Sequence, residues 1–249
     1  MFGGGTIKEE ELKKVSSKLE KSKAIKAFNQ KMMFRYLIII LLIIFVFLLL
    51  VFGATSLGVR ENTFTIRIGD SSLSKIGYGS NYSHLIGLSE DDSFESSFTN
   101  LSFNGVHNMT NISVLDIPLD VDEGIGEHNG KNYLAYSFFL KNFEEESTIT
   151  ESIFIKSVSR NLDKAIRVRV YRNGLYLDYA KANDEGESEY NTTSFYSDEI
   201  VYKLSHNLDH GEIVKYTIVI WLEGDDPDCT NSLYGGMIKL GMDFNVDEK

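Results

Sequence analysis

The longest unbroken apolar run of the chain lies near its N-terminus. From Tyr36 to Phe52 no side chain carries a charge or an amide, and continuation to Leu57 makes the segment 22 residues long. A helix of about 20 apolar residues crosses the ~30 Å hydrocarbon core of a bilayer. A helix at the surface of a globular core would keep a polar face. The pattern therefore predicts one transmembrane helix over residues 36–57.

Beyond Arg60 apolar positions alternate with polar ones, which is the period of strands with one buried face. The alternating segments are Tyr133–Lys141, Ile166–Val170, Leu175–Tyr179 and Ile238–Phe244. Glu212–Leu222 is apolar on both faces over much of its length, which is typical of a central strand. Asn173-Gly174 predicts a tight hairpin, because both residue types tolerate positive φ.

Further runs bring the expected number of strands to seven or eight: Phe64–Ile68, Ile149–Val158 and Glu199–Leu204. Closely spaced strands without helices between them favour an all-β fold, here an antiparallel β-sandwich with jelly-roll or Greek-key connections. The section Ser80–His128 is rich in Ser, Asn and acidic residues, and predicts long loops with one or two strands of the same domain. We therefore expect the sandwich to span residues 58–249.

Charge is distributed unevenly around the apolar segment. Residues up to Tyr36 carry nine Lys/Arg and four Glu, whereas residues from Leu57 onward carry 16 Lys/Arg and 32 Asp/Glu. The positive-inside rule assigns the basic side to the cytoplasm. Residues 1–35 are thus predicted to form a cytoplasmic leader, largely helical, and residues 58–249 an extracellular domain beside the lipid bilayer. An acidic outer domain repels phosphate backbones, so we expect no nucleic-acid partner.

Two alternatives stay open around the apolar segment. Ala54-Thr55-Ser56 resembles a small-x-small cleavage site, so cleavage after Ser56 is the alternative to a permanent signal-anchor. Signal peptides usually have apolar regions of only about 7–15 residues, which favours the anchor. On the cytoplasmic side, the lysines either serve only as a topology signal or hold a helix against anionic lipid.

Cysteine usage bears on the source of the protein. Cys229 is the only cysteine, so no intrachain disulfide can form. Animal secreted domains often carry disulfides, and their absence from an extracellular domain favours a bacterial, Gram-positive surface. The Asn-x-Ser/Thr triplets at Asn81, Asn100, Asn108, Asn111 and Asn191 would be glycan sites only in a eukaryote.

Clustered carboxylates are the candidate metal ligands. Asp225, Asp226 and Asp228 surround Pro227 directly after the strand that ends at Glu223-Gly224. Ca²⁺ takes six to eight oxygen ligands, so these three aspartates are calcium candidates. The alternative is a polar turn in which the aspartates bond their own backbone. A second acidic group has the same two interpretations: Asp116, Asp120, Asp122, Glu123 and Glu127.

No catalytic motif emerges from the remaining polar residues. His206 and His210 are four apart, but the sequence between them is HNLDH in a predicted loop and lacks the glutamate of H-E-x-x-H zinc proteases. They read as two surface histidines. Cys229 has no neighbouring histidine base and reads as a structural thiol. We therefore assign no catalytic or cofactor-binding residue.

Three stretches resemble a known group of proteins: HNGKNYLAYSFFLKN (His128 to Asn142), AIRVRVYRNG (Ala165 to Gly174) and KYTIVIWLEGDDPDCTNSLYGGMIKLGMDF (Lys215 to Phe244). With the leader and single span, they resemble single-pass membrane-anchored β-sandwich proteins of clostridia and related Firmicutes. The sandwich and its last strand more distantly resemble the TasA/camelysin surface-protein family, which implies a fibre or biofilm-matrix role. The chain departs from that family in its 35-residue leader and its lack of a clear signal-peptidase site.

Together these features predict a membrane-anchored, non-enzymatic cell-surface protein that binds or scaffolds a protein or glycan of the cell envelope. The first alternative is a subunit of a TasA/camelysin-like extracellular fibre, assembled by strand exchange. The second is a metal-dependent hydrolase, which would require polar residues that converge in a pocket.

Overall fold

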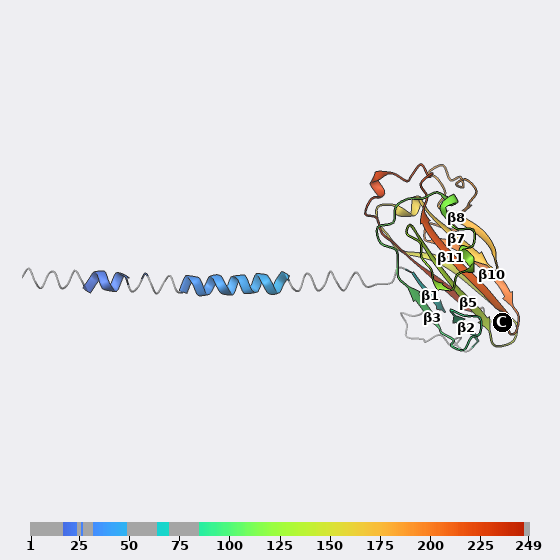
Figure 1. Ribbon diagram of the computed structural model, residues 1–249, viewed down its shortest axis with the longest axis horizontal. Helices are drawn as coiled ribbons and strands as arrows, with labels where there is room; N and C mark the ends of the chain where they lie inside the picture. The colour runs from blue at the N-terminus through green and yellow to red at the C-terminus, as the bar shows by residue number, and fades with distance from the viewer. Residues whose placement is uncertain (1–16, 24–25, 27–31, 49–63, 70–84, 247–249) are drawn as a thin grey trace, which may run out of the picture. The chain divides into compact units, whose positions relative to one another are not determined.

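A computed structural model describes residues 17–23, 26, 32–48, 64–69 and 85–246 of the chain. The chain divides into two compact units, Met1–Glu61 and Asn62–Lys249. The N-terminal unit contributes helical residues 17–23 and 32–48, drawn in blue in Figure 1. The second unit contains every described strand.

The predicted transmembrane helix is only partly within the described residues. Residues 36–48 are helical and their side chains are exposed, whereas residues 49–57 lie outside the described part of the chain. Among the described residues, no helix combines the length and the apolarity that crossing a membrane requires. Most of the predicted leader, including residues 1–16, also lies outside the described residues.

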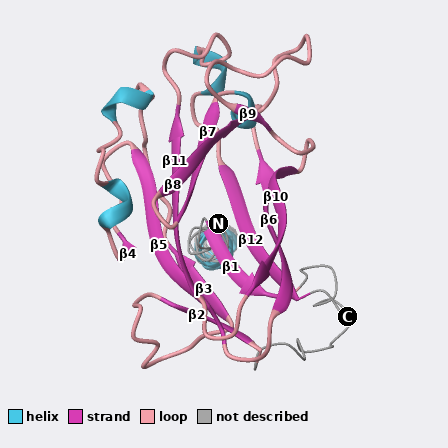
Figure 2. Cartoon of the chain, turned by 90° about the vertical axis from the view of Figure 1, so that its right-hand side faces the viewer, coloured by secondary structure: helices cyan, strands magenta, loops and turns pink. Residues whose placement is uncertain are grey.

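The strands of the second unit form two sheets. Sheet A has five strands in the order β10 (Ile200–Leu208), β6 (Ser147–Val158), β12 (Ile238–Val246), β1 (Phe64–Ile68) and β3 (Asn100–Phe103). Sheet B has the order β2 (Ile86–Ser89), β5 (Tyr133–Asn142), β11 (Ile213–Leu222), β7 (Ile166–Arg172), β8 (Leu175–Ala180) and β9 (Thr193–Ser194), with β4 (Gly126–Glu127) also paired to β5. Figure 2 shows both sets of strands.

The long strands confirm the β-rich fold that the alternation of apolar and polar residues predicted. Each of the predicted segments lies in or overlaps a strand, and β11 is central in sheet B, between β5 and β7. Asn173 and Gly174 have φ of 50° and 80°, as the hairpin between β7 and β8 requires. The sequence predicted too few strands, because β2, β3, β4 and β9 are only two to four residues long.

The prediction of purely antiparallel pairing is wrong at two places. β1 pairs with β12 in parallel, with Phe64 opposite Leu240, and β8 pairs with β9 in parallel. The first and last strands of the domain have no tight turn between them, so no hairpin geometry forces them to run in opposite directions. The pairings between all other described strands are antiparallel.

The inward faces of the two sheets share one hydrophobic core. Leu134, Tyr136, Phe138 and Leu140 of β5 join Leu240, Met242 and Phe244 of β12 in this core. The rings of Phe138 and Phe244 are 6.0 Å apart, and those of Tyr216 and Phe244 are 5.4 Å apart. Each such side chain contributes about 1.5–3 kcal/mol when fully buried. The alternation of the strands thus stabilises a two-layered domain.

A second, smaller core covers the outer face of sheet B. Ile117 and Val121 belong to a loop with two short 3-10 turns, Val114–Asp116 and Val121–Glu123. They pack with Ala135, Tyr171, Val219 and Trp221. This cover explains why β11 is apolar on both faces, because both of its faces are buried.

Candidate functional site

The two sheets meet through backbone hydrogen bonds at one side of the domain and through side chains at the other. At the first side, β2 of sheet B bonds to the chain before β3 of sheet A through Leu88 N to Phe98 O, at 2.9 Å. At the other side lie β8 of sheet B and β10, the end strand of sheet A. Between them is a groove of about 440 Å³, and we call it the β8–β10 groove.

Apolar side chains form most of the groove. The lining residues are Val170, Arg172, Asn173, Leu175, Tyr176, Leu177, Tyr179, Tyr202, Lys203 and Leu204. Leu175 is 80% exposed, Leu177 57% and Leu204 38%. Small-molecule and peptide sites are typically concave and mostly apolar, with a few polar groups. The lining fits that description.

Beneath the groove, a buried carboxyl group joins the two sheets. Glu151 of β6 is fully buried. Its Oε1 accepts a hydrogen bond from the hydroxyl of Tyr202 in β10, and its Oε2 accepts one from the hydroxyl of Tyr216 in β11. A buried carboxyl group must be satisfied by hydrogen bonds or an opposite charge. The two tyrosines, one from each sheet, supply these hydrogen bonds.

Two basic side chains complete this cluster, which we call the Glu151 cluster. His206 Nε2 lies 3.5 Å from Glu151 Oε2, and Arg172 Nη2 lies 2.8 Å from His206 Nδ1. Burial lowers the pKa of Arg172, but the neighbouring Tyr216, Glu151 and Tyr202 outweigh burial and hold that pKa above its usual value. The arginine therefore stays cationic at the floor of the groove.

The tyrosines of the floor are poor acids. Burial and the adjacent Glu151 raise the pKa of Tyr202 and Tyr216 well above the usual value, and raise the pKa of Tyr179 to about 12. General acid–base catalysis is most efficient when the pKa of the group lies near the working pH. These tyrosines are therefore fixed hydrogen-bond donors at neutral pH, suited to structure and binding.

The three predicted calcium ligands have separate partners. Asp225 Oδ2 accepts from Ser113 Oγ at 3.1 Å, and buried Asp226 accepts from Arg167 Nη2 at 2.6 Å. Asp228 Oδ2 lies 4.0 Å from Lys164 Nζ. Across the described residues, no group of three or more His, Cys, Asp or Glu side chains is placed to hold a metal ion. Calcium binding at these aspartates stays a prediction.

Carboxylates of the second acidic group bond to nearby backbone. Asp116 Oδ2 accepts from Ser113 N at 3.0 Å within a capping box. Glu127 Oε2 accepts from Asn104 N at 3.2 Å. These contacts are the ones expected of polar turns and caps.

The histidines differ from their predicted setting. His206 lies in β10 and its side chain is only 12% exposed, so it is part of the Glu151 cluster and not of a surface loop. His210 lies in the following turn, with Nδ1 2.6 Å from Glu144 O. The strand continues to Leu208, further than the sequence around HNLDH indicated.

Burial raises the pKa of Cys229, which suits an unreactive thiol.

The sequence did not single out Glu151, Arg172, Tyr202 or Tyr216. A signal for Glu151 does exist, because it lies on the same strand face as Ile149 and Ile153, which are both buried. A glutamate in the middle of an apolar strand face requires a partner. The identity of the partners could not follow from this pattern, because they come from two other strands.

Comparison with protein-family models gives no match, and no curated protein matches the chain. Among solved structures, a beta-glucosidase from Kluyveromyces marxianus aligns over 64% of this chain and 17% of its own, at 12% identity and a TM-score of 0.23. Its complex with glucose aligns over 64% of this chain and 16% of its own, at 13% identity and 0.21. This chain thus spans about a sixth of that enzyme.

The N-terminal domain of PorA aligns over 65% of this chain and 96% of its own, at 4% identity and a TM-score of 0.21. At such identities and TM-scores, none of these likenesses assigns a family or an activity to the chain.

Proposed function

We propose that this chain is a single-pass, membrane-anchored and non-enzymatic cell-surface protein whose β domain binds a partner of the cell envelope. Residues 36–57 form the anchor, and residues 58–249 form a β-sandwich with jelly-roll or Greek-key connections outside the cell. The β8–β10 groove carries the proposal, because its exposed leucines form a concave apolar surface. Exposed apolar patches of this kind mark interaction sites.

The anchor is supported by helical residues 36–48, whose apolar side chains are all exposed. Orientation depends on the charge close to the apolar segment, and residues up to Tyr36 supply nine Lys/Arg against four Glu. The resemblance to membrane-anchored proteins of clostridia and related Firmicutes supports the same location.

A binding role fits the chemistry of the groove floor better than catalysis does. The pKa values of Tyr202 and Tyr216 are raised even further above neutral pH than that of an ordinary tyrosine. Each oxygen of Glu151 accepts a hydrogen bond from one of these tyrosines. A hydrolase would need a base or nucleophile poised near the working pH. The floor instead offers fixed donors and the cation Arg172, and both ring nitrogens of its histidine, His206, face Glu151 or Arg172.

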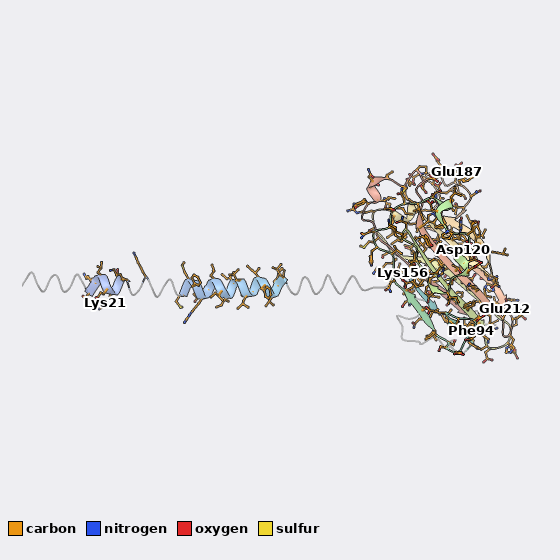
Figure 3. The ribbon with its side chains drawn as sticks, viewed as in Figure 1. Lys21, Phe94, Asp120, Lys156, Glu187 and Glu212 are labelled. Carbon is orange, nitrogen blue, oxygen red and sulfur yellow. The ribbon has the colours of Figure 1, made fainter. Side chains whose placement is uncertain are left out.

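Photo-crosslinking in native cells tests the binding role with the full chain. A photoreactive phenylalanine analogue replaces Leu177 in one strain and exposed Glu187, which lies in a loop outside the groove (Figure 3), in a control strain. We expect a discrete crosslinked species from position 177 and none from position 187. Equal crosslinking at both positions, or none at position 177, would refute the groove as the binding site.

The second candidate function is a subunit of an extracellular fibre. β10 pairs only with β6 among the described strands, so its other edge from Tyr202 to Leu208 is open to strand addition. The distant resemblance to TasA/camelysin proteins favours the same role.

Intact mass and N-terminal sequence of the protein from its own cells separate the two candidates. The anchored protein is expected in the membrane fraction at 28.2 kDa. A species that begins at Leu57 and is found in the medium would overturn the anchor and favour the fibre subunit.

A further inference from the structure

The outer faces of the two sheets differ in what covers them. The loop that contains Ile117 and Val121 packs on the outer face of sheet B. No hydrophobic cluster of the described residues covers the outer face of sheet A. The side chains of that face are polar apart from Phe154: Thr65 and Arg67 of β1, Thr148, Thr150, Ser152, Phe154 and Lys156 of β6, Lys203, Ser205 and Asn207 of β10, and Lys239, Asp243 and Asn245 of β12.

The strand register supports this assignment of side chains to the outer face. Ser152 lies opposite Asp243 of β12 and opposite Lys203 of β10. Lys156 reaches over Gly241 and donates to Thr65 Oγ1, which places it on the same face. Side chains of directly paired residues project from the same side of a sheet. The named residues therefore form one continuous surface, which we call the sheet A face.

The sheet A face is basic on an acidic domain. Its strands present Arg67, Lys156, Lys203 and Lys239 outward and the single carboxylate Asp243, which pairs with Arg67 at 3.4 Å. From Leu57 onward the chain carries twice as many acidic as basic residues, 32 against 16. Figure 3 shows Lys156 and Glu212 at opposite edges of the domain. A basic patch within an acidic surface attracts an anionic partner.

Between the cations, the sheet A face carries hydroxyl and amide groups. Thr150 Oγ1 and Ser205 Oγ are 2.7 Å apart, and Thr148 Oγ1 donates to Asn207 Oδ1 at 3.0 Å. A shallow hollow of about 230 Å³ lies beside them, lined by Thr150, Ser152, Phe154, Ile200, Lys203, Asp243 and Asn245. Hydroxyl and amide side chains both donate and accept hydrogen bonds, as the hydroxyl groups of a sugar do.

We propose that the sheet A face binds an anionic glycan. Its Ser, Thr and Asn side chains would hydrogen-bond sugar hydroxyls, and the half-buried ring of Phe154 would lie against the C–H face of a sugar ring. Lys156 and Lys203 would pair with carboxylate or phosphate groups along the chain. Exposed ion pairs are individually weak, so affinity depends on repeated contacts along the polymer.

A glycan fits this face better than a nucleic acid does. Single-stranded nucleic acids are held by successive aromatic side chains on which the bases stack, and Phe154 is the one aromatic side chain among the described residues that line the hollow. The closely spaced phosphates of a duplex would also meet the net negative charge of the rest of the domain. This site shares Lys203 with the β8–β10 groove but no other lining residue, so crosslinking from Leu177 in the groove does not decide it.

Binding of polygalacturonate, an acidic sugar polymer, to the full chain in phosphatidylcholine nanodiscs tests the proposal. We expect saturable binding that weakens with salt, and no binding of neutral dextran. The variant Lys156→Glu/Lys203→Glu should bind at least tenfold more weakly. The matched control Lys131→Glu/Lys215→Glu makes the same change of charge away from the sheet A face and should stay within about twofold of the parent.

Several outcomes would overturn the proposal: no binding, equal binding of dextran, or equal losses in the two double variants. Tighter binding of single-stranded DNA than of polygalacturonate would show a general polyanion site and would also refute it. The neutral variant Lys156→Gln/Lys203→Gln keeps the test valid if charge reversal prevents folding. Phe154→Ala should weaken binding of polygalacturonate but not that of inorganic polyphosphate, which has no sugar ring.

Discussion

Glu151 illustrates how one residue shapes the groove side of this domain. The carboxyl group is fully buried, and hydrogen bonds from Tyr202 of sheet A and Tyr216 of sheet B reach its two oxygens. Loss of a partner from a buried charged or polar group costs about 1–3 kcal/mol. The cluster therefore links the two sheets beneath the β8–β10 groove.

The buried tyrosines make stability sensitive to alkali. Burial, with Glu151 nearby, raises the pKa of Tyr179 to about 12, against about 10 in the unfolded chain. Below pH 10 both states keep the proton, so the contribution is fully present. Between pH 10 and 12 only the unfolded chain loses it, and the free energy of unfolding falls by about 1.4 kcal/mol per pH unit for this group.

Urea unfolding between pH 9 and 11.5 measures this effect. Tyr179→Phe should show a shallower fall in the free energy of unfolding above pH 10 than the parent protein. Tyr190→Phe, at a side chain that is 89% exposed, should leave the slope unchanged. Identical slopes for all three proteins would contradict the assignment of the raised pKa to burial of Tyr179.

The strands could be predicted from the sequence to the extent that they are long and alternate. β5 and β12 could be predicted because one face of each strand is apolar in sequence. Phe138 of β5 and Phe244 of β12 belong to these faces and are buried in the core. β4 and β9 could not be predicted, because a strand of two residues is too short to show the alternation of apolar and polar positions. The Glu151 cluster could not be predicted either, because it depends on which strands become neighbours. Alternation determines which side chains are buried but not which strands pair.

The β7–β8 hairpin is an element whose turn residues can be tested. Gly174 has φ of +80°, a conformation that costs an L-residue about 1 kcal/mol. Gly174→Ala should therefore lower the free energy of unfolding by about 1 kcal/mol, measured by urea unfolding. Gly174→Asn should lose less, because Asn tolerates this region. Equal losses for the two substitutions would indicate that the backbone conformation is not their cause.

At the scale of the whole molecule, the chain divides into two compact units. Every residue of the two hydrophobic cores lies within Asn62–Lys249. The described residues that form the cores of the β domain therefore lie in the second unit. This unit has 188 residues, a size at which a domain buries enough surface to fold alone.

We expect the fragment Asn62–Lys249 to fold without the N-terminal unit. Its thermal unfolding midpoint, followed by the near-ultraviolet circular dichroism of Trp221 and the core tyrosines, should match that of the full chain in nanodiscs. A broad, non-cooperative transition of the fragment would contradict the division of the chain into two units.

The parallel pairing of β1 with β12 has a consequence for how the protein is made. β12 joins the β6–β10 pair to the β1–β3 pair within sheet A. At about 5–20 residues per second, roughly 10–35 s pass between synthesis of Phe64 and of its partner Leu240. Until β12 is made, the β1–β3 pair and the β6–β10 pair, which is complete only at Leu208, have no strand that joins them in the sheet. A chain that terminates before Ile238 would keep them in that state, as a substrate for chaperones and quality-control proteases.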